Sequence, residues 1–150
     1  MKIITSILAF GIFMPLALAC GKQRISGEIQ SFKYEENTMR AVPSKYYCVE
    51  RNEEGVLVFK FEDYRHPLTV VKAPDDILEV IDGYVQSYKL CYLKDSYVNT
   101  HVLDGTMWNL NIKYAEGSIY SGGSNKWPAG KLRAGMDAIE AYLKSLIDKE

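Results

Sequence analysis

The sequence predicts an α+β fold, a single domain with a mainly antiparallel sheet built from hairpins and two amphipathic helices packed on it. Alternation of apolar and polar residues over 108–114 is typical of a strand with one buried face. Two β-rich segments, residues 46–50 and 56–61, flank the polar connection 52–55, which is typical of a hairpin. After Pro128, an apolar stripe at helical spacing predicts the last helix. Its members are Leu132, Met136, Ile139, Leu143 and Leu146.

The first part of the domain is expected to supply further strands. Residues 26–35 are predicted to form a strand, and a loop containing Pro43 follows. Residues 56–61 are apolar on both faces, which predicts a central strand with something packed on each side. Residues 68–71 are expected to form one more short strand.

The first helix is expected to begin at Pro74-Asp75-Asp76, because two acidic side chains there meet the positive end of the helix dipole. Apolar residues follow at helical spacing: Ile77, Leu78, Ile81, Val85 and Tyr88. Gly83 lowers the stability of this helix by up to about 1 kcal/mol relative to alanine. Residues 91–105 are expected to include a long connection.

The second hairpin is predicted to join strand 108–114 to residues 118–121 through a turn at 115–117. Residues 122–125 are expected to end the sheet. On the last helix, Glu140 and Lys144 are expected to form a favourable exposed ion pair, since they lie four residues apart.

Residues 1–19 have the composition of a bacterial secretory leader, with Lys2 ahead of an interrupted apolar run. The strongly apolar part of this run is short for a membrane-spanning helix. Ala17-Leu18-Ala19-Cys20 resembles a lipobox, in which the cysteine thiol receives a diacylglycerol. The alternative is a plain secretory signal cleaved after Ala19, which leaves Cys20 as a spare thiol.

The lipobox divides the chain into a signal peptide (1–19), an anchor with a short tether (20–25) and one α+β domain (26–150). The membrane is then a partner through the N-terminal lipid, and more than one acyl chain gives stable anchoring. Gly21 stands where an aspartate would favour the inner membrane, and residues 21–24 lack acidic side chains. We therefore expect an outer-membrane lipoprotein of the bacterial cell envelope that faces the periplasm.

Composition and motifs exclude several classes of protein. A hydrophobic content of 47% and a charged content of 25% indicate a folded globular domain, and a net charge of −1 argues against nucleic acid as a partner. The motifs of zinc hydrolases, nucleophile elbows and phosphate loops are absent, as is C-x-x-C. We expect no cofactor and no metal, because His66 and His101 would need help from Asp63 or Asp104 and no tight ligand spacing is visible.

Cys48 and Cys91 are the two cysteines of the folded part. In an oxidising compartment they are a candidate disulfide, which would stabilise the fold by about 4 kcal/mol in the chain-entropy model. The alternative is a pair of buried free thiols, since Cys48 lies in an apolar strand pattern. A catalytic role for Cys91, with His66 or His101 as its base, has no local motif to support it.

A possible binding surface is formed by Trp127, Ser124 and Asn125, near the end of the second hairpin. The segment 121–125 could present backbone N–H groups to an anion. The simpler interpretation is a strand exit, with glycine at positive φ and Asn125 satisfying free amides. The other aromatic residues are expected to fill the sheet faces of a small domain.

A longer pattern runs through the last third of the chain. It reads LDG-x-x-W-x-L-x-I-x-Y from 103 to 114, then Glu116-Gly117, then SGGSN at 121–125 and Pro128. This pattern resembles that of an uncharacterised family of lipoproteins from gut-type bacteria, in which one glycine is usual where this chain has Gly122-Gly123. The resemblance implies the fold and the lipid anchor and carries no activity.

The sequence therefore predicts a membrane-anchored envelope lipoprotein with a non-enzymatic binding domain, whose partner is an envelope protein or a glycan. The alternative is a small hydrolase-like enzyme with a pocket that motifs do not reveal. Two or more of His66, His101, Asp104 and Cys91 would then lie within hydrogen-bond reach in one pocket.

Overall fold

The computed structural model describes residues 19–20, 23–38, 43–102 and 105–148. Along the chain, its elements are β1 (Ala19–Cys20), β2 (Gln23–Arg24), β3 (Ser26–Asn37), β4 (Lys45–Arg51), β5 (Leu57–Asp63), β6 (Thr69–Lys72), α1 (Ile77–Tyr88), the 3-10 helix η1 (Leu90–Tyr92), β7 (Ser96–Val98), β8 (Met107–Glu116), β9 (Ser118–Ser124) and α2 (Gly130–Ile147).

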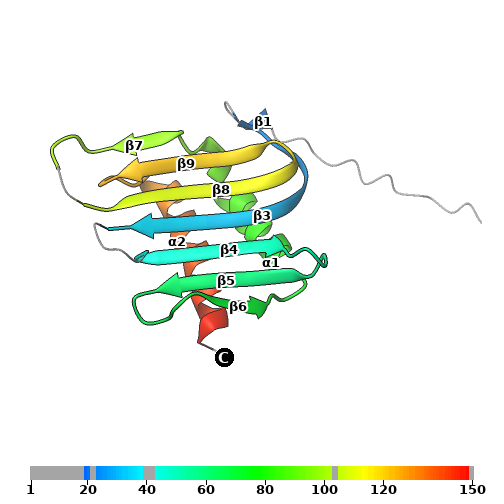
Figure 1. The fold of residues 1–150 in the computed structure, drawn as a ribbon. Coiled ribbons are helices and arrows are strands. Elements are labelled where there is room, and N and C mark those ends of the chain that lie inside the picture. Colours follow the sequence, from blue (N-terminus) through cyan, green and yellow to red (C-terminus); the bar gives the residue numbers. More distant parts are fainter. Residues whose placement is uncertain (1–18, 21–22, 39–42, 103–104, 149–150) are drawn as a thin grey trace, which may run out of the picture.

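Seven strands form one sheet in the order β6-β5-β4-β3-β8-β9-β7, and α1 and α2 both lie on the same side of it (Figure 1). Neighbouring strands are antiparallel except β7 and β9, which are parallel. The predicted α+β fold is thus confirmed. The described part of the chain leaves the other side of the sheet uncovered (Figure 1), and we call this side the open face.

The alternation predicted for β8 is present in the structure. Four of its side chains are at most 5% exposed and face the helices, namely Trp108, Leu110, Ile112 and Tyr114. The residues between them face the other side of the sheet, because successive side chains of a strand alternate. Asn109, Asn111 and Lys113 therefore belong to the open face.

The long strand β3 connects the two predicted hairpins, because it pairs with β4 on one side and with β8 on the other. Its register with β8 shifts twice between Ser26 and Ser31. Gly27 lies in this irregular segment with φ +77°, and a Cβ there would press on Ala115. The bulged start of β3 thus needs glycine for both its backbone conformation and its close contact.

Helix α2 packs its predicted stripe against the sheet. Met136, Ile139 and Leu143 are buried, and Leu132 and Leu146 are partly buried against the same core. Gly135 allows α2 to approach the end of α1, because a Cβ at this position would meet Tyr88 and Leu90. Within the ranges given above, no helix is both long and apolar enough to cross a bilayer.

Helix α1 extends to Tyr88 as the apolar spacing predicts, and it continues through Gly83 because its buried side chains, including Ile77, Ile81 and Val85, hold it against the core. One segment differs from expectation. The expected connection over 91–105 contains β7, which pairs with β9. Only Tyr97 of β7 packs inward, against Trp108, so this short strand has no alternating pattern to read.

The expectation that β5 is covered on both sides is wrong. Phe59 and Phe61 face the helices and are buried. Val58 lies on the open face, where it is 7% exposed between its cross-strand neighbours Glu50 and Lys72. The long side chains of Glu50 and Lys72 therefore shield Val58 from solvent, where the sequence pattern predicts a second packed layer.

Candidate functional site

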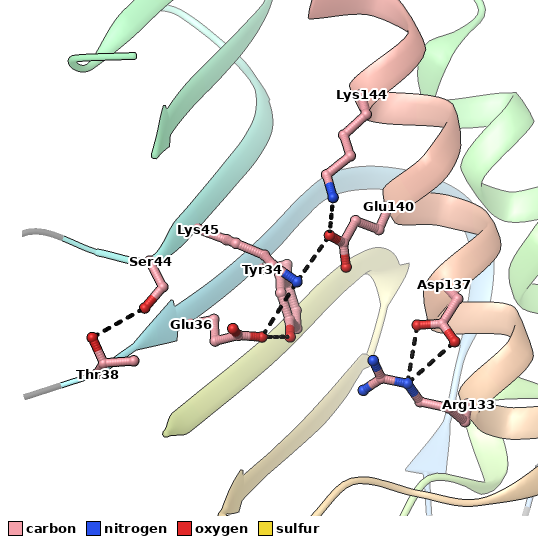
Figure 2. Close-up of polar contacts among 9 residues, drawn as sticks. All are labelled: Tyr34, Glu36, Thr38, Ser44, Lys45, Arg133, Asp137, Glu140 and Lys144. Carbon is pink, nitrogen blue, oxygen red and sulfur yellow. Dashed lines mark hydrogen bonds and ion pairs between the residues drawn. The ribbon is translucent and has the colours of Figure 1, made fainter. Parts of the chain in front are cut away.

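Charged side chains connect α2 to β3 and β4 on the helix-covered side of the sheet (Figure 2). Glu140 Oε1 lies 2.9 Å from Lys45 Nζ and 2.7 Å from Lys144 Nζ. Lys45 Nζ also lies 3.7 Å from Glu36 Oε2, which accepts a 3.0 Å hydrogen bond from the Tyr34 hydroxyl. We call these five residues the polar network.

The polar network fixes the protonation of its members. Burial by itself raises the pKa of Glu140, but hydrogen bonds from Lys144 and Lys45 outweigh it, and the pKa lies below its ordinary value. Burial, followed by the nearby Glu36, raises the pKa of Tyr34. Glu140 is therefore a carboxylate at neutral pH, and its side chain is 16% exposed, so the expected Glu140–Lys144 pair is present but is not fully exposed.

Beneath the network lies a cavity of about 20 Å³ between α2 and the sheet, whose walls include Tyr47, Leu110 and Leu143. A volume of this size holds about one water molecule. A larger hollow of about 430 Å³ lies near β6, where Phe59, Pro74 and Leu146 line it together with Lys72 and Asp75. Its size is that of a small-molecule site, but its lining contains no histidine or cysteine.

The side chains considered for catalysis lie in different places. His66 Nδ1 lies 3.0 Å from Asp63 Oδ1 beyond the end of β5. Burial alone raises the pKa of Asp63, but backbone hydrogen bonds from Arg65 and His66 outweigh it and lower this pKa. His101 is exposed between β7 and β8, where its backbone N–H donates to Asn99 Oδ1.

Asp104 lies outside the described residues. Among the residues that the structure describes, no three or more His, Cys, Asp or Glu side chains are grouped so as to hold a metal ion.

The disulfide predicted between Cys48 and Cys91 is wrong, because Cys48 is a free buried thiol. Cys91 packs in η1 within the core on the helix side. Cys48 lies on β4 in the row of side chains that face the open side, as its alternation with Tyr47 requires. The sheet thus separates the two cysteines. Burial, followed by Glu50, raises the pKa of the Cys48 thiol.

The strand exit after β9 depends on close packing rather than on glycines at positive φ. Asn125, and not Gly122 or Gly123, adopts the left-handed conformation, with φ 54°. Its side-chain Oδ1 accepts a 2.8 Å hydrogen bond from the Thr106 N–H, as the simpler interpretation of this segment expects. A Cβ at Gly123 would collide with the Trp108 indole, so this position requires the smallest residue.

The three residues of the predicted binding surface have different surroundings. Ser124 pairs with Met107 and Val98 at the end of the sheet. Asn125 holds the neighbouring connection, as described above. Trp127 packs partly buried against the core, with the Arg133 guanidinium 5.6 Å from its ring centroid. The structure therefore does not bring these side chains together on one face.

The open face is the larger polar surface that the topology creates. Lys33 Nζ lies 3.4 Å from Glu35 Oε2 and 5.4 Å from the ring centroid of Tyr46. Lys60 Nζ donates a 2.7 Å hydrogen bond to Glu50 Oε1. Charges of both signs therefore pair along β3, β4 and β5.

Amides continue the open face across β8. Asn111 stands between Lys33 on β3 and Tyr120 on β9, and its Oδ1 is buried without a hydrogen-bond partner. Asn109 lies beside Gly122, where a Cβ would come within 2.8 Å of Asn109 Oδ1. Amide groups thus occupy the centre of the face, with the half-exposed ring of Tyr120 next to them.

Sequence reasoning predicted the Glu140–Lys144 pair but missed the rest of the polar network, because its members are spread from 34 to 144. A signal was present: on the alternating strands β3 and β4, Glu36 and Lys45 occupy positions on the buried face. Charged residues at such positions indicate a partner across the core. Comparison with protein-family models and with curated proteins finds no match for this chain.

Proposed function

We propose that this chain is a lipid-anchored lipoprotein of the bacterial envelope whose domain binds another envelope component without catalysis. The leader ending in Ala17-Leu18-Ala19-Cys20 supports the anchor. Ile25, which is 5% exposed in the core, supports a short tether, because the chain enters the core five residues after Cys20. Two or more acyl chains on Cys20 then hold the domain on the membrane.

The observation that carries the binding function is the uncovered polar sheet face. The centres of protein interfaces are depleted in lysine and glutamate, whereas this face carries Lys33, Glu35 and Lys113. Amides both donate and accept hydrogen bonds, as sugar hydroxyls do, and Asn109 is exposed on this face with the partly exposed Asn111 beside it on β8. The favoured partner is therefore a glycan of the envelope.

The wide separation of His66, His101 and Cys91 supports binding over catalysis. Cys91 is buried in the core, whereas reactive cysteines are partly exposed. Asp63 accepts hydrogen bonds from the Arg65 and His66 backbone, which is the arrangement of a structural turn.

Metabolic labelling with a fatty-acid analogue tests the anchor. The wild-type chain should carry the label and sediment with membranes, and Cys20→Ala should abolish both. Cys48→Ala is the matched control, because it also removes a cysteine but should keep the label. A soluble, unlabelled wild-type protein would contradict lipidation.

Sedimentation with purified cell-wall glycan tests the binding function, with the lipoprotein kept in non-ionic detergent. The double variant Asn109→Ala/Asn111→Ala should bind about thirtyfold more weakly, since two hydrogen bonds of roughly 1 kcal/mol each are lost. Lys131→Ala, on the exposed side of α2, should bind like the wild type. Equal binding by all three proteins, or cross-linking of the open face to a protein instead, would refute the glycan.

A further inference from the structure

We propose that the sheet edge formed by β7 and β9 rests on the lipid surface that holds the anchor, and that the β6 edge points away from it. This inference rests on the proposed lipidation of Cys20. It adds an orientation, and with it a second contact between the protein and the membrane.

The path of the tether shows which edge of the sheet lies near Cys20. Cys20, the residue of β1 that remains after signal cleavage, pairs with Gln23 of β2, and β2 lies against β9. Figure 1 shows β1 beside the edge of the sheet that β9 and β7 form, and remote from β6. After β2, Ile25 enters the core. The lipid-bearing residue thus joins the domain at one particular edge.

The sheet is wider than the reach of the tether. Cys20 and Ile25 are five residues apart, so even an extended tether reaches only about 17 Å. Five strand spacings separate β9 from β6, which amounts to about 24 Å at the usual strand separation. The tether is therefore too short to let the β6 edge lie on the bilayer while β2 stays against β9.

The side chains on the anchored edge suit a lipid surface. Tyr92 of η1 is 54% exposed and Val98 of β7 is 51% exposed. Lys89 and Lys94 are exposed on either side of Tyr92, and Asp95 is the acidic neighbour on this segment. Tyrosine is favoured at the membrane interface, and lysines are attracted to anionic headgroups.

The other surfaces near the tether fit less well. The turn between β8 and β9 and the start of β3 carry exposed acidic side chains, Glu116 and Glu28, which an anionic surface repels. The open face presents lysine and glutamate pairs that lipid would have to desolvate. The edge with Tyr92 and Val98 is therefore the surface that the tether and the chemistry both favour.

Quenching by spin-labelled lipid tests this orientation on the full lipidated protein. Val98→Cys and Val70→Cys form a matched pair, since both replace a valine that is about half exposed on an edge strand, at opposite edges of the sheet. Each protein carries a thiol-attached fluorophore and is reconstituted in phosphatidylethanolamine–phosphatidylglycerol vesicles. Wild type taken through the same labelling reports any background from the buried Cys48.

We expect several-fold stronger quenching of the fluorophore at 98 than at 70, and a smaller difference after Lys89→Glu/Lys94→Glu. Equal quenching at both positions, or stronger quenching at 70, would overturn the orientation while leaving lipidation intact. Failure of both labelled proteins to sediment with the vesicles would instead refute the anchor, and the orientation with it.

Discussion

Leu143 tests whether α2 and the centre of the sheet share one core. Its side chain is fully buried and lines the small cavity together with Phe32, Tyr47 and Leu110. Leu143→Ala removes three carbon atoms from a place where packing is already incomplete. The variant therefore enlarges an existing void.

The expected loss follows from two terms. Three buried carbons contribute about 2.4 kcal/mol at roughly 0.8 kcal/mol each. Space that the neighbours do not refill adds about 24 cal/mol per Å³. Because Phe32 and Leu110 leave the present cavity unfilled, they are poorly placed to refill a larger one, and we expect a loss of about 4 kcal/mol, in the upper half of the usual range for leucine-to-alanine changes.

Urea unfolding followed by tryptophan fluorescence, in the same non-ionic detergent for each protein, measures this loss. The midpoint should fall while the slope stays constant, which indicates a change in stability alone. Leu146→Ala lies on the same stripe but is only partly buried, so its loss should be clearly smaller. A loss below about 0.5 kcal/mol for Leu143→Ala, or a larger loss for Leu146→Ala, would refute the packing argument.

Three further predictions follow from particular contacts. Glu140→Gln should lower the free energy of unfolding by roughly 1–2 kcal/mol at pH 7. Because the folded-state pKa of Glu140 is lowered, the stability that its carboxylate contributes is present above the ordinary pKa and is lost as the pH falls. The free energies of unfolding of the variant and the wild type, measured in urea, should therefore approach each other toward pH 3. Gly83→Ala should raise the thermal midpoint, since nothing lies within 4 Å of the added Cβ and helix propensity improves by about 0.5–1 kcal/mol, whereas Gly123→Ala should lower it because the Cβ meets the Trp108 indole. Cys48 should react with maleimide only after unfolding in urea, and rapid reaction of the native protein would contradict its burial.

The elements with a strong local pattern could be predicted, because the spacing of their apolar residues also determines which face is buried. In β8, the apolar residues Trp108 to Tyr114 face the helices and the polar residues between them face the open side. The same alternation predicts that Asn109 and Asn111 lie on the polar side of the strand. In α2, the spacing of Met136, Ile139 and Leu143 directly gives the buried stripe.

Tertiary partners could not be predicted in this way. The Lys45–Glu140 ion pair joins residues far apart in sequence, and its geometry depends on how α2 crosses the strands. The pairing of β7 with β9 depends on backbone hydrogen bonds, which any residue type can make. Cys48 and Cys91 face opposite sides of the sheet, and the pairing rule for extracellular cysteines carries no information about sides.

Proximity in sequence was also a poor guide to a shared surface. Ser124, Asn125 and Trp127 are near neighbours, but the left-handed backbone at Asn125 turns the chain between Ser124 and Trp127. Ser124 thus ends a strand of the sheet, while Trp127 packs toward Arg133 on α2. The polar open face instead draws its residues from several strands, and only the strand order brings them together.

The proposed anchor and the open face use different parts of the sheet. If β7 lies on the bilayer, the strands run parallel to the membrane and the open face stands upright above it. Asn111 on β8 is then two strand spacings from β7, and Tyr46 on β4 is four, which places them about 10 and 19 Å above that edge. The acyl chains fix the domain through an edge that the amides and ion pairs do not occupy. The same short tether that restricts the domain to the membrane therefore keeps its polar face clear of the lipid and accessible to a glycan in the adjoining aqueous space.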